Sequence, residues 1–225
     1  MAFQIGTIFI LTLFYGCYII KMIIQKRAGI KTECLGKEKS GFTKRLEIIL
    51  KFSTYSTFAA EIVSLALNTT VFPFWLRTVG FVFAITGTFV FIIAVYTMKD
   101  SWRAGVSRTE KTKLVTSSIF QISRNPAFLG FDLIYIGIVF MFFNVPLFLI
   151  SIFSIVILHL QIVCNEEPFL QETFGKEYFE YEKHVNRYIG KRNYSVKKCS
   201  KSQRISPQTP RYETFCINQN SAEND

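Results

Sequence analysis

Hydrophobic positions in this chain gather into long uninterrupted runs, separated by short polar connections. About 20 apolar residues in an α-helix rise about 30 Å, which is the thickness of the hydrocarbon core of a membrane. Such runs cover residues 3–24, 48–67, 74–98, 127–144 and 145–164. The pattern predicts an all-α integral membrane protein with about five transmembrane helices.

The fourth and fifth runs are separated only by the turn Asn144-Val145-Pro146. Two spanning helices joined by a tight turn must return the chain to the side it left. We therefore expect Arg124, Asn125 and Pro126 on the same membrane face as the polar residues that follow the fifth run. A polar site is predicted at that end of the hairpin.

The second run contains two ionisable residues, Lys51 and Glu61. Lys51 lies near the start of the run, where a long side chain can reach the membrane surface. Glu61 lies deeper, and an ionisable group at that depth normally faces the bundle interior or a polar cavity. The favoured interpretation is a structural partner for a polar group on another helix.

Charge in the connections predicts the orientation in the membrane. The first and third connections are rich in Lys and Arg, whereas the second and fourth contain neither. Cytoplasmic flanks of membrane helices carry an excess of Lys and Arg. We therefore expect the N-terminus outside and the basic loops, the polar site and the C-terminus in the cytoplasm. This arrangement accounts for the net charge of +10 without a nucleic-acid partner.

Beyond the fifth run, Tyr178, Tyr181, Val185 and Tyr188 follow the spacing of one helical face. They predict a cytoplasmic amphipathic helix over residues 175–189, which either lies on the membrane surface or caps the bundle.

The predicted helices and loops divide the chain into three regions. They are the first three helices with a basic cytoplasmic loop (1–97), a core of loop, hairpin and cap helix (98–190), and a polar tail expected to be disordered (191–225).

The five cysteines are scattered and form no C-x-x-C pair. This spacing predicts neither a metal site nor a disulfide framework, so reduced thiols are expected.

The start of the fourth run carries the first candidate chemistry. Pro126 suits the first turn of a helix, whose free N–H groups can bind an anion. Arg124 and Asn125 add donors, and Gly130 permits close approach of a ligand or of another helix. Taken alone, an ordinary helix start with a basic flank explains this fragment better.

Glu166 and Glu167 directly follow the fifth run, where two carboxylates oppose the helix dipole. They are tolerable if a cation or sugar hydroxyls need them, or if Arg124 or Arg187 pairs with them. Asp132 and His159 lie close enough in sequence to line the same cavity. A neutral histidine bonded between helices is the commoner arrangement and the default interpretation for His159.

These residues belong to an ordered set of motifs with a family resemblance. The motifs are Met98-x-x-Ser101-Trp102-Arg103, Ser123-Arg124-Asn125-Pro126-x-Phe128-x-Gly130, Glu166-Glu167-x-x-Leu170-x-x-x-Phe174-Gly175-x-x-Tyr178-x-x-Tyr181 and Val185-x-Arg187-Tyr188-Ile189. Together they resemble the isoprenylcysteine carboxyl methyltransferase family. That family is part of a wider group of membrane methyltransferases that includes phospholipid N-methyltransferases.

The resemblance implies S-adenosylmethionine as cofactor and a lipid-soluble acceptor that enters between helices. Catalytic roles would fall to Arg187, which orients the acceptor carboxylate, and to Glu167. The implied cofactor-binding residues are Arg124, Asn125, Pro126, Phe128, Gly130, Glu166 and Glu167. The chain departs from the family pattern at three positions: Asn125 replaces the usual His, Phe128 the usual Tyr, and Gly190 a common Pro.

The resulting prediction is S-adenosylmethionine-dependent O-methylation of an isoprenylcysteine-like or other lipidic carboxylate. A carboxylate is already a nucleophile, so alignment in a dry pocket would suffice without a strong base. N-methylation of a phospholipid or other amine is the first alternative, with Glu166, Glu167 or His159 as the base. An NADPH-dependent sterol-type reductase and a non-enzymatic membrane protein are the others.

Overall fold

The computed structural model describes residues 1–30, 41–103 and 113–191, and throughout this part of the chain the regular elements are helices. The chain is thus an all-α integral membrane protein, as predicted. The long helices are α1 (Ala2–Arg27), α2 (Gly41–Leu67), α3 (Phe74–Met98), α4 (Pro126–Met141) and α5 (Val145–Gln161). The shorter elements are η1 (Lys99–Ser101), η2 (Ser118–Gln121), η3 (Ile162–Glu166), α6 (Glu167–Phe174) and α7 (Lys176–His184).

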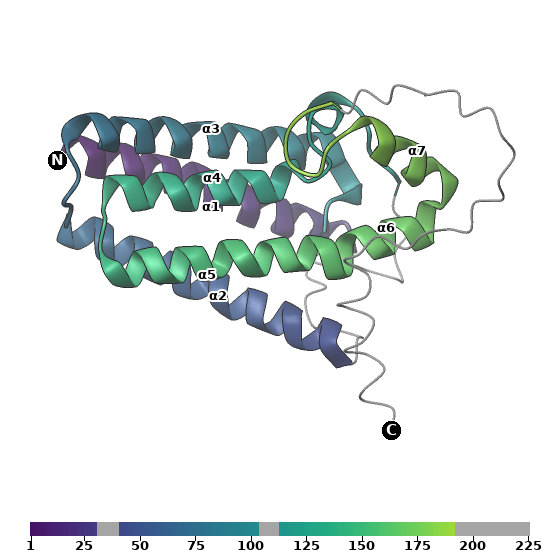
Figure 1. The fold of residues 1–225 in the computed structure, drawn as a ribbon, viewed down its shortest axis with the longest axis horizontal. Helices are drawn as coiled ribbons and strands as arrows, with labels where there is room; N and C mark the ends of the chain where they lie inside the picture. The colour runs from purple at the N-terminus through teal and green to yellow at the C-terminus, as the bar shows by residue number, and fades with distance from the viewer. Residues whose placement is uncertain (31–40, 104–112, 192–225) are drawn as a thin grey trace, which may run out of the picture.

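Within the described ranges, four helical runs are long and apolar enough to cross a membrane: α1, α2, α3 with η1, and the run from Val145 to Phe174. The fourth predicted span corresponds to α4, which has 16 residues and rises only about 24 Å. It lies alongside α3 in the bundle (Figure 1). The second span begins at Gly41 rather than at residue 48. Charged helix formers precede its apolar run, and hydropathy alone does not detect them.

Helices α3 and α4 pack backbone against backbone through two pairs of glycines. A methyl group on Gly87 would lie 2.7 Å from the carbonyl oxygen of Gly130. One on Gly137 would lie 2.5 Å from the carbonyl oxygen of Gly80. Small residues are the usual means by which membrane helices approach this closely. The contact brings the beginning of α4 against the end of α3.

Polar side chains join the other helices inside the bundle. The phenol of Tyr15 on α1 donates to Glu61 Oε2 over 3.2 Å, and Glu61 is fully buried. Thr57 on α2 and Ser154 on α5 are hydrogen-bonded at 2.7 Å. The prediction that Glu61 faces the interior with a partner on another helix is therefore confirmed.

The elements that follow the spans gather at one end of the bundle, away from the N-terminus (Figure 1). Helices α6 and α7 continue from α5 there and lie near η2 and the start of α4. The hairpin thus returns the chain to this end, as its tight turn predicts. The polar tail predicted for residues 191–225 lies outside the described residues from residue 192 onward.

The expectation of reduced thiols is confirmed for Cys17, which is free. It is wrong for Cys164, which is disulfide-bonded. Two cysteines need only be brought together by the fold to form a bond, so the absence of a short C-x-x-C spacing does not exclude a disulfide.

Replacement of Gly87 by alanine is expected to lower the stability of the bundle by about 1–3 kcal/mol, because α3 and α4 must separate to admit the methyl group. The measurement is the thermal unfolding midpoint of the detergent-purified protein. Gly16→Ala is the matched control, because nothing lies within 4 Å of the added carbon. Equal midpoints for the two variants would contradict the role given to the glycine contact.

Candidate active site

The helix that leaves the membrane is widened at the predicted pair of glutamates. Residues Ile162–Glu166 form a π-helix between α5 and α6. Pro168 lacks the N–H that would continue the α-helical ladder, which accounts for a local change of winding. Adjacent side chains on a helix point in different directions, so the two neighbouring glutamates have different surroundings. Glu166 lines a pocket, whereas Glu167 is buried against two arginines.

Glu167 is held by both arginines that the sequence singled out. Arg187 binds it with two hydrogen bonds, from Nε to Oε1 over 2.8 Å and from Nη2 to Oε2 over 2.7 Å. Arg124 Nη1 lies 3.2 Å from Oε1 on the other side. The side chains of Arg124 and Glu167 are only 6% and 8% exposed. Pairing with arginine therefore explains why a carboxylate is tolerated at this position.

Arg124 also contacts α7, which sequence reasoning did not anticipate. Its Nη1 donates to Glu182 Oε1 over 2.9 Å and to the phenol oxygen of Tyr178 over 3.0 Å. Burial raises the pKa of Tyr178, so the phenol remains protonated. Tyr178 and Glu182 lie one helical turn apart, and this spacing was the available signal. Arg124, Arg187, Glu167 and Glu182 thus form a group of two positive and two negative charges, which we call the ion-pair cluster.

Arg187 reaches this cluster because a tight loop, residues 185–191, docks beside the start of α4. The amide of Arg124 donates to Asn186 O over 3.1 Å, and Asn125 Nδ2 donates to Arg187 O over 3.3 Å. The amide of Gly190 donates to Ile122 O over 2.9 Å. These bonds fix the loop backbone and point the Arg187 side chain at Glu167.

Gly190 explains one departure from the family pattern. Its φ of +113° lies in the region that favours glycine, and its N–H is used in docking the loop. Proline can supply neither feature. The backbone conformation of this loop thus requires glycine at position 190, where the family commonly has proline.

The amphipathic helix predicted over residues 175–189 is shorter than expected. It ends at His184, and Val185 already has an extended backbone with φ −124° and ψ 133°. The loop's bonds to Ile122, Arg124 and Asn125 replace helical bonds there, and the spacing of aromatic residues does not reveal them. Tyr178 is buried and Tyr181 donates to Phe120 O over 2.6 Å, so α7 caps the bundle.

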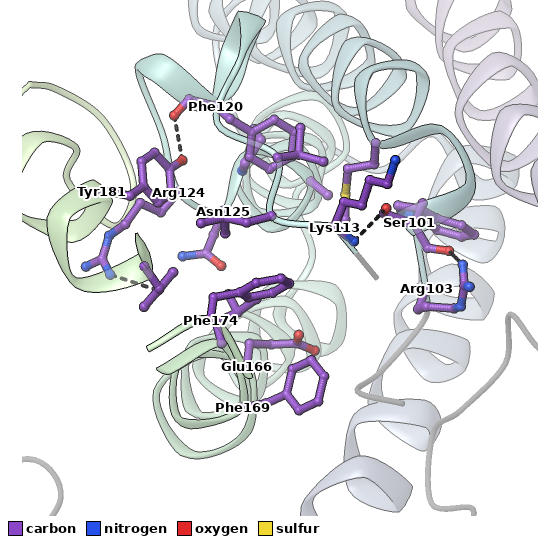
Figure 2. A pocket seen from close by; sticks show the side chains of 18 of the residues that line it. Ser101, Arg103, Lys113, Phe120, Arg124, Asn125, Glu166, Phe169, Phe174 and Tyr181 are labelled. Carbon is purple, nitrogen blue, oxygen red and sulfur yellow. Dashed lines mark hydrogen bonds between the residues drawn. The ribbon is translucent and has the colours of Figure 1, made fainter. Parts of the chain in front are cut away.

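A pocket opens between the start of α4, α6 and the segment after α3. Figure 2 shows Asn125, Glu166 and Phe174 around it, with Ser101 and Lys113 on the far side. Arg124 of the ion-pair cluster forms part of its wall. Several other aromatic side chains also line the pocket: Trp102, Phe120, Phe128, Phe169, Tyr178 and Tyr181.

A second, mostly apolar groove runs between α4 and α5. Its apolar walls are formed by Leu129, Leu133, Ile136, Ile155, Val156 and Leu160. Three polar side chains share the groove: Asp132, His159 and Tyr188. His159 Nδ1 and Tyr188 Oη are 2.8 Å apart, and their rings stack at 5.9 Å. His159 is thus bonded to the loop that contains Tyr188 and not to another helix, and it lines a groove, so its default interpretation as a bond between helices is wrong.

The ion-pair cluster borders the pocket and is next in sequence to the groove. Arg124 lines the pocket and contacts Glu167, whereas Arg187, which also contacts Glu167, directly precedes Tyr188 of the groove. Burial, followed by the neighbouring charge of Asp132, raises the pKa of Tyr188 to about 12. The hydrogen bond to Glu167 raises the pKa of Arg187 above its usual value.

Most of the residues predicted to bind a cofactor meet at the pocket, and two do not. The pocket is lined by Arg124, Asn125, Pro126, Phe128 and Glu166. Glu167 lies behind Arg124, in the ion-pair cluster. Gly130 faces α3, where an added Cβ would lie 2.9 Å from Gly87 O and from Phe91 Cβ. The sequence allowed Gly130 to admit either a ligand or another helix. The structure places it at a helix contact.

Comparison with known proteins locates the resemblance in this part of the chain. Residues 75–177 match the family model described as phospholipid methyltransferase. A protein-S-isoprenylcysteine O-methyltransferase B from Arabidopsis thaliana is 30% identical over 115 residues, which cover 49% of this chain and 57% of the relative. The match thus spans little more than half the length of that relative. The resemblance recognised from the motifs is confirmed.

Replacement of Gly190 by proline is expected to release loop 185–191, because the variant loses the bond to Ile122 and cannot adopt the observed φ. Tryptic cleavage after Arg187 in the detergent-purified protein should accelerate, since a docked loop is a poor protease substrate. Ile189→Ala is the control in the same loop, because its side chain is 64% exposed. A cleavage rate equal to that of the control would contradict the docking role of Gly190.

Proposed function

We propose that this chain methylates the carboxylate of an isoprenylcysteine-like or other lipidic acceptor, with S-adenosylmethionine as the methyl donor. The proposal is supported by its resemblance to phospholipid methyltransferases and to a protein-S-isoprenylcysteine O-methyltransferase. The observation that carries the proposal is the position of the ion-pair cluster. One of its arginines, Arg124, lines a polar, aromatic-lined pocket, and the other, Arg187, directly precedes Tyr188, which lines an apolar groove between membrane helices. A water-soluble donor and a lipid acceptor would meet there.

The residues of the pocket fit S-adenosylmethionine. Aromatic side chains such as Phe169 and Phe174 offer faces on which a purine can stack. Glu166 can accept hydrogen bonds from ribose hydroxyls or from an ammonium group. Arg124 and the first turn of α4 can bind a carboxylate, because free helix N–H groups attract anions. When bound, the cofactor supplies a methyl group on a positively charged sulfur.

The groove fits the lipid portion of the acceptor. Its apolar walls belong to two adjacent membrane helices, and Val156 on α5 is 49% exposed on the outer surface of the bundle. An isoprenoid or acyl chain could therefore enter from the bilayer without crossing water. Such burial contributes about 0.8 kcal/mol per methylene group. The acceptor head would then lie near Tyr188 and Arg187.

In this mechanism the protein aligns reactants and moves no proton. A bound donor would supply the methyl group from its sulfonium, and a carboxylate acceptor is already a nucleophile and would need no base. Glu167 fixes the plane of the Arg187 guanidinium through two hydrogen bonds. Arg187 can then orient the acceptor carboxylate toward the methyl group. Correct alignment of reacting atoms is itself a large part of a rate enhancement.

Transfer to an amine is the second candidate, because the family model that matches residues 75–177 is named for phospholipid methylation. An amine must lose a proton, and both carboxylate oxygens of Glu167 are already bound by Arg187. His159 or Glu166 would have to serve. The reductase and non-enzymatic interpretations are tested by the binding measurement below.

The proposed orientation follows the loop charges. The basic loops, the ion-pair cluster and the C-terminus lie in the cytoplasm, and the N-terminus lies outside. The pocket would then open toward the compartment from which the donor is drawn. Residues 98–190 form the proposed catalytic unit, with residues 1–97 as its membrane support.

The purified protein is expected to bind labelled S-adenosylmethionine saturably, with displacement by S-adenosylhomocysteine and none by NADPH. Glu166→Gln should weaken binding about tenfold, because a charged hydrogen-bond acceptor is lost. Glu180→Gln is the control, because that carboxylate lies on the outer face of α7 with a side chain 64% exposed. Displacement by NADPH would favour the reductase. No saturable binding by folded protein would refute the proposed donor.

Glu167→Gln and Arg187→Ala are each expected to lower methyl transfer to a farnesylated cysteine derivative by at least about 100-fold, because the orienting pair is broken. Arg187→Lys should not restore it, since lysine cannot make the two parallel bonds. The label should be released from the product as methanol in alkali, which identifies an ester. Alkali-stable label would indicate N-methylation. Normal turnover in both variants would remove the pair from the site.

A further inference from the structure

The polar end of the groove contains a carboxylate that the proposed mechanism does not use. Asp132 lies on α4 and lines the groove together with His159 and Tyr188. Its Oδ1 atom is buried and has no hydrogen-bond partner among the described residues. Burial without a partner is costly for any polar atom, and more so between membrane helices. A ligand that donates a hydrogen bond there would remove this cost.

The neighbouring side chains do not supply that donor. His159 and Tyr188 are bonded to each other at 2.8 Å, and their rings are stacked. Arg187 directs its Nε and Nη2 at Glu167. The polar end of the groove therefore has an unmet requirement, a hydrogen-bond donor for Asp132. The carboxylate of the proposed acceptor would lie toward Arg187, which directly precedes Tyr188 of the groove.

We propose that Asp132 is a specificity-determining residue of the acceptor groove, where it accepts a hydrogen bond from an N–H group carried next to the carboxylate that is methylated. The inference rests on the proposed function, because it assigns the same groove to the acceptor. It adds a selection that an apolar groove and an arginine do not provide. A lipid acid with an adjacent amide is accepted, and a plain lipid acid of equal length is disfavoured.

The physical basis is an asymmetry in hydrogen bonding. A site built around a buried acceptor discriminates strongly against a ligand that lacks the matching donor, since the acceptor then stays unpaired. An additional apolar contact discriminates far less. Asp132 therefore affects the choice between acceptors more than any single apolar wall residue does.

The test compares two ligands that differ only in the N–H-bearing group. N-acetyl-S-farnesylcysteine has a carboxylate with an adjacent amide, and S-farnesyl-3-thiopropionic acid has the carboxylate alone. Dissociation constants for both are measured by equilibrium binding to the full chain in detergent. We expect the amide ligand to bind about 10–100-fold tighter to the unaltered protein, because the other ligand leaves a buried acceptor without a partner.

The variant Asp132→Ala should remove this preference by weakening the amide ligand alone. Asp132→Asn keeps a carbonyl acceptor and should restore part of it. Leu133→Ala is the matched control from the same groove and should weaken both ligands equally, because it changes only the apolar wall. Retained binding of S-adenosylmethionine in each variant would verify that the pocket is intact.

Three outcomes would overturn the inference. The first is equal binding of the two ligands, or no binding of either, by the unaltered protein. The second is an equal loss for both ligands in Asp132→Ala. The third is a stronger dependence on Asp132 for S-farnesylcysteamine, an amine without the carboxylate, which would make Asp132 an ammonium site. Ligand preference without methyl transfer would instead refute the proposed function and leave the role of Asp132 standing.

Discussion

A single carboxylate held between two arginines ties together the parts of this molecule that lie far apart in sequence. Glu167 comes from the helix that leaves the membrane, Arg124 from the approach to α4, and Arg187 from the last described loop. Removing one member of such a buried group leaves an uncompensated charge, at a cost of about 3–5 kcal/mol. The hairpin, the cap helix and the loop are therefore constrained as a unit.

The membrane helices supply the geometry that this cluster needs. Backbone contact at Gly87 and Gly130 places α4 directly beside α3, so the first turn of α4 and the segment after α3 form two walls of one pocket. At the end of the π-helix, Glu166 lines the pocket and Glu167 contacts the arginines. Neighbouring residues contribute to different contacts here because adjacent side chains on a helix point in different directions.

The sequence was most informative where structure depends on local composition. The third span matches α3 from Phe74 to Met98, because apolar run length is a property of the sequence itself. The motif residues at the pocket were also found in advance. The start of α2, the early end of α7 and the contact of Arg124 with Glu182 were missed. Each depends on charged helix formers or on bonds between distant segments, which hydropathy and spacing do not record.

The docking of loop 185–191 has a consequence for how the protein is made. The membrane helices and both arginine-binding glutamates, Glu167 and Glu182, precede this loop in the chain. A ribosome has therefore released nearly the whole membrane domain before Arg187 is available. The pocket can form early, but Tyr188 of the groove and the guanidinium of Arg187 are added last. A chain truncated before the loop would keep every membrane helix and would leave Glu167 without its second arginine.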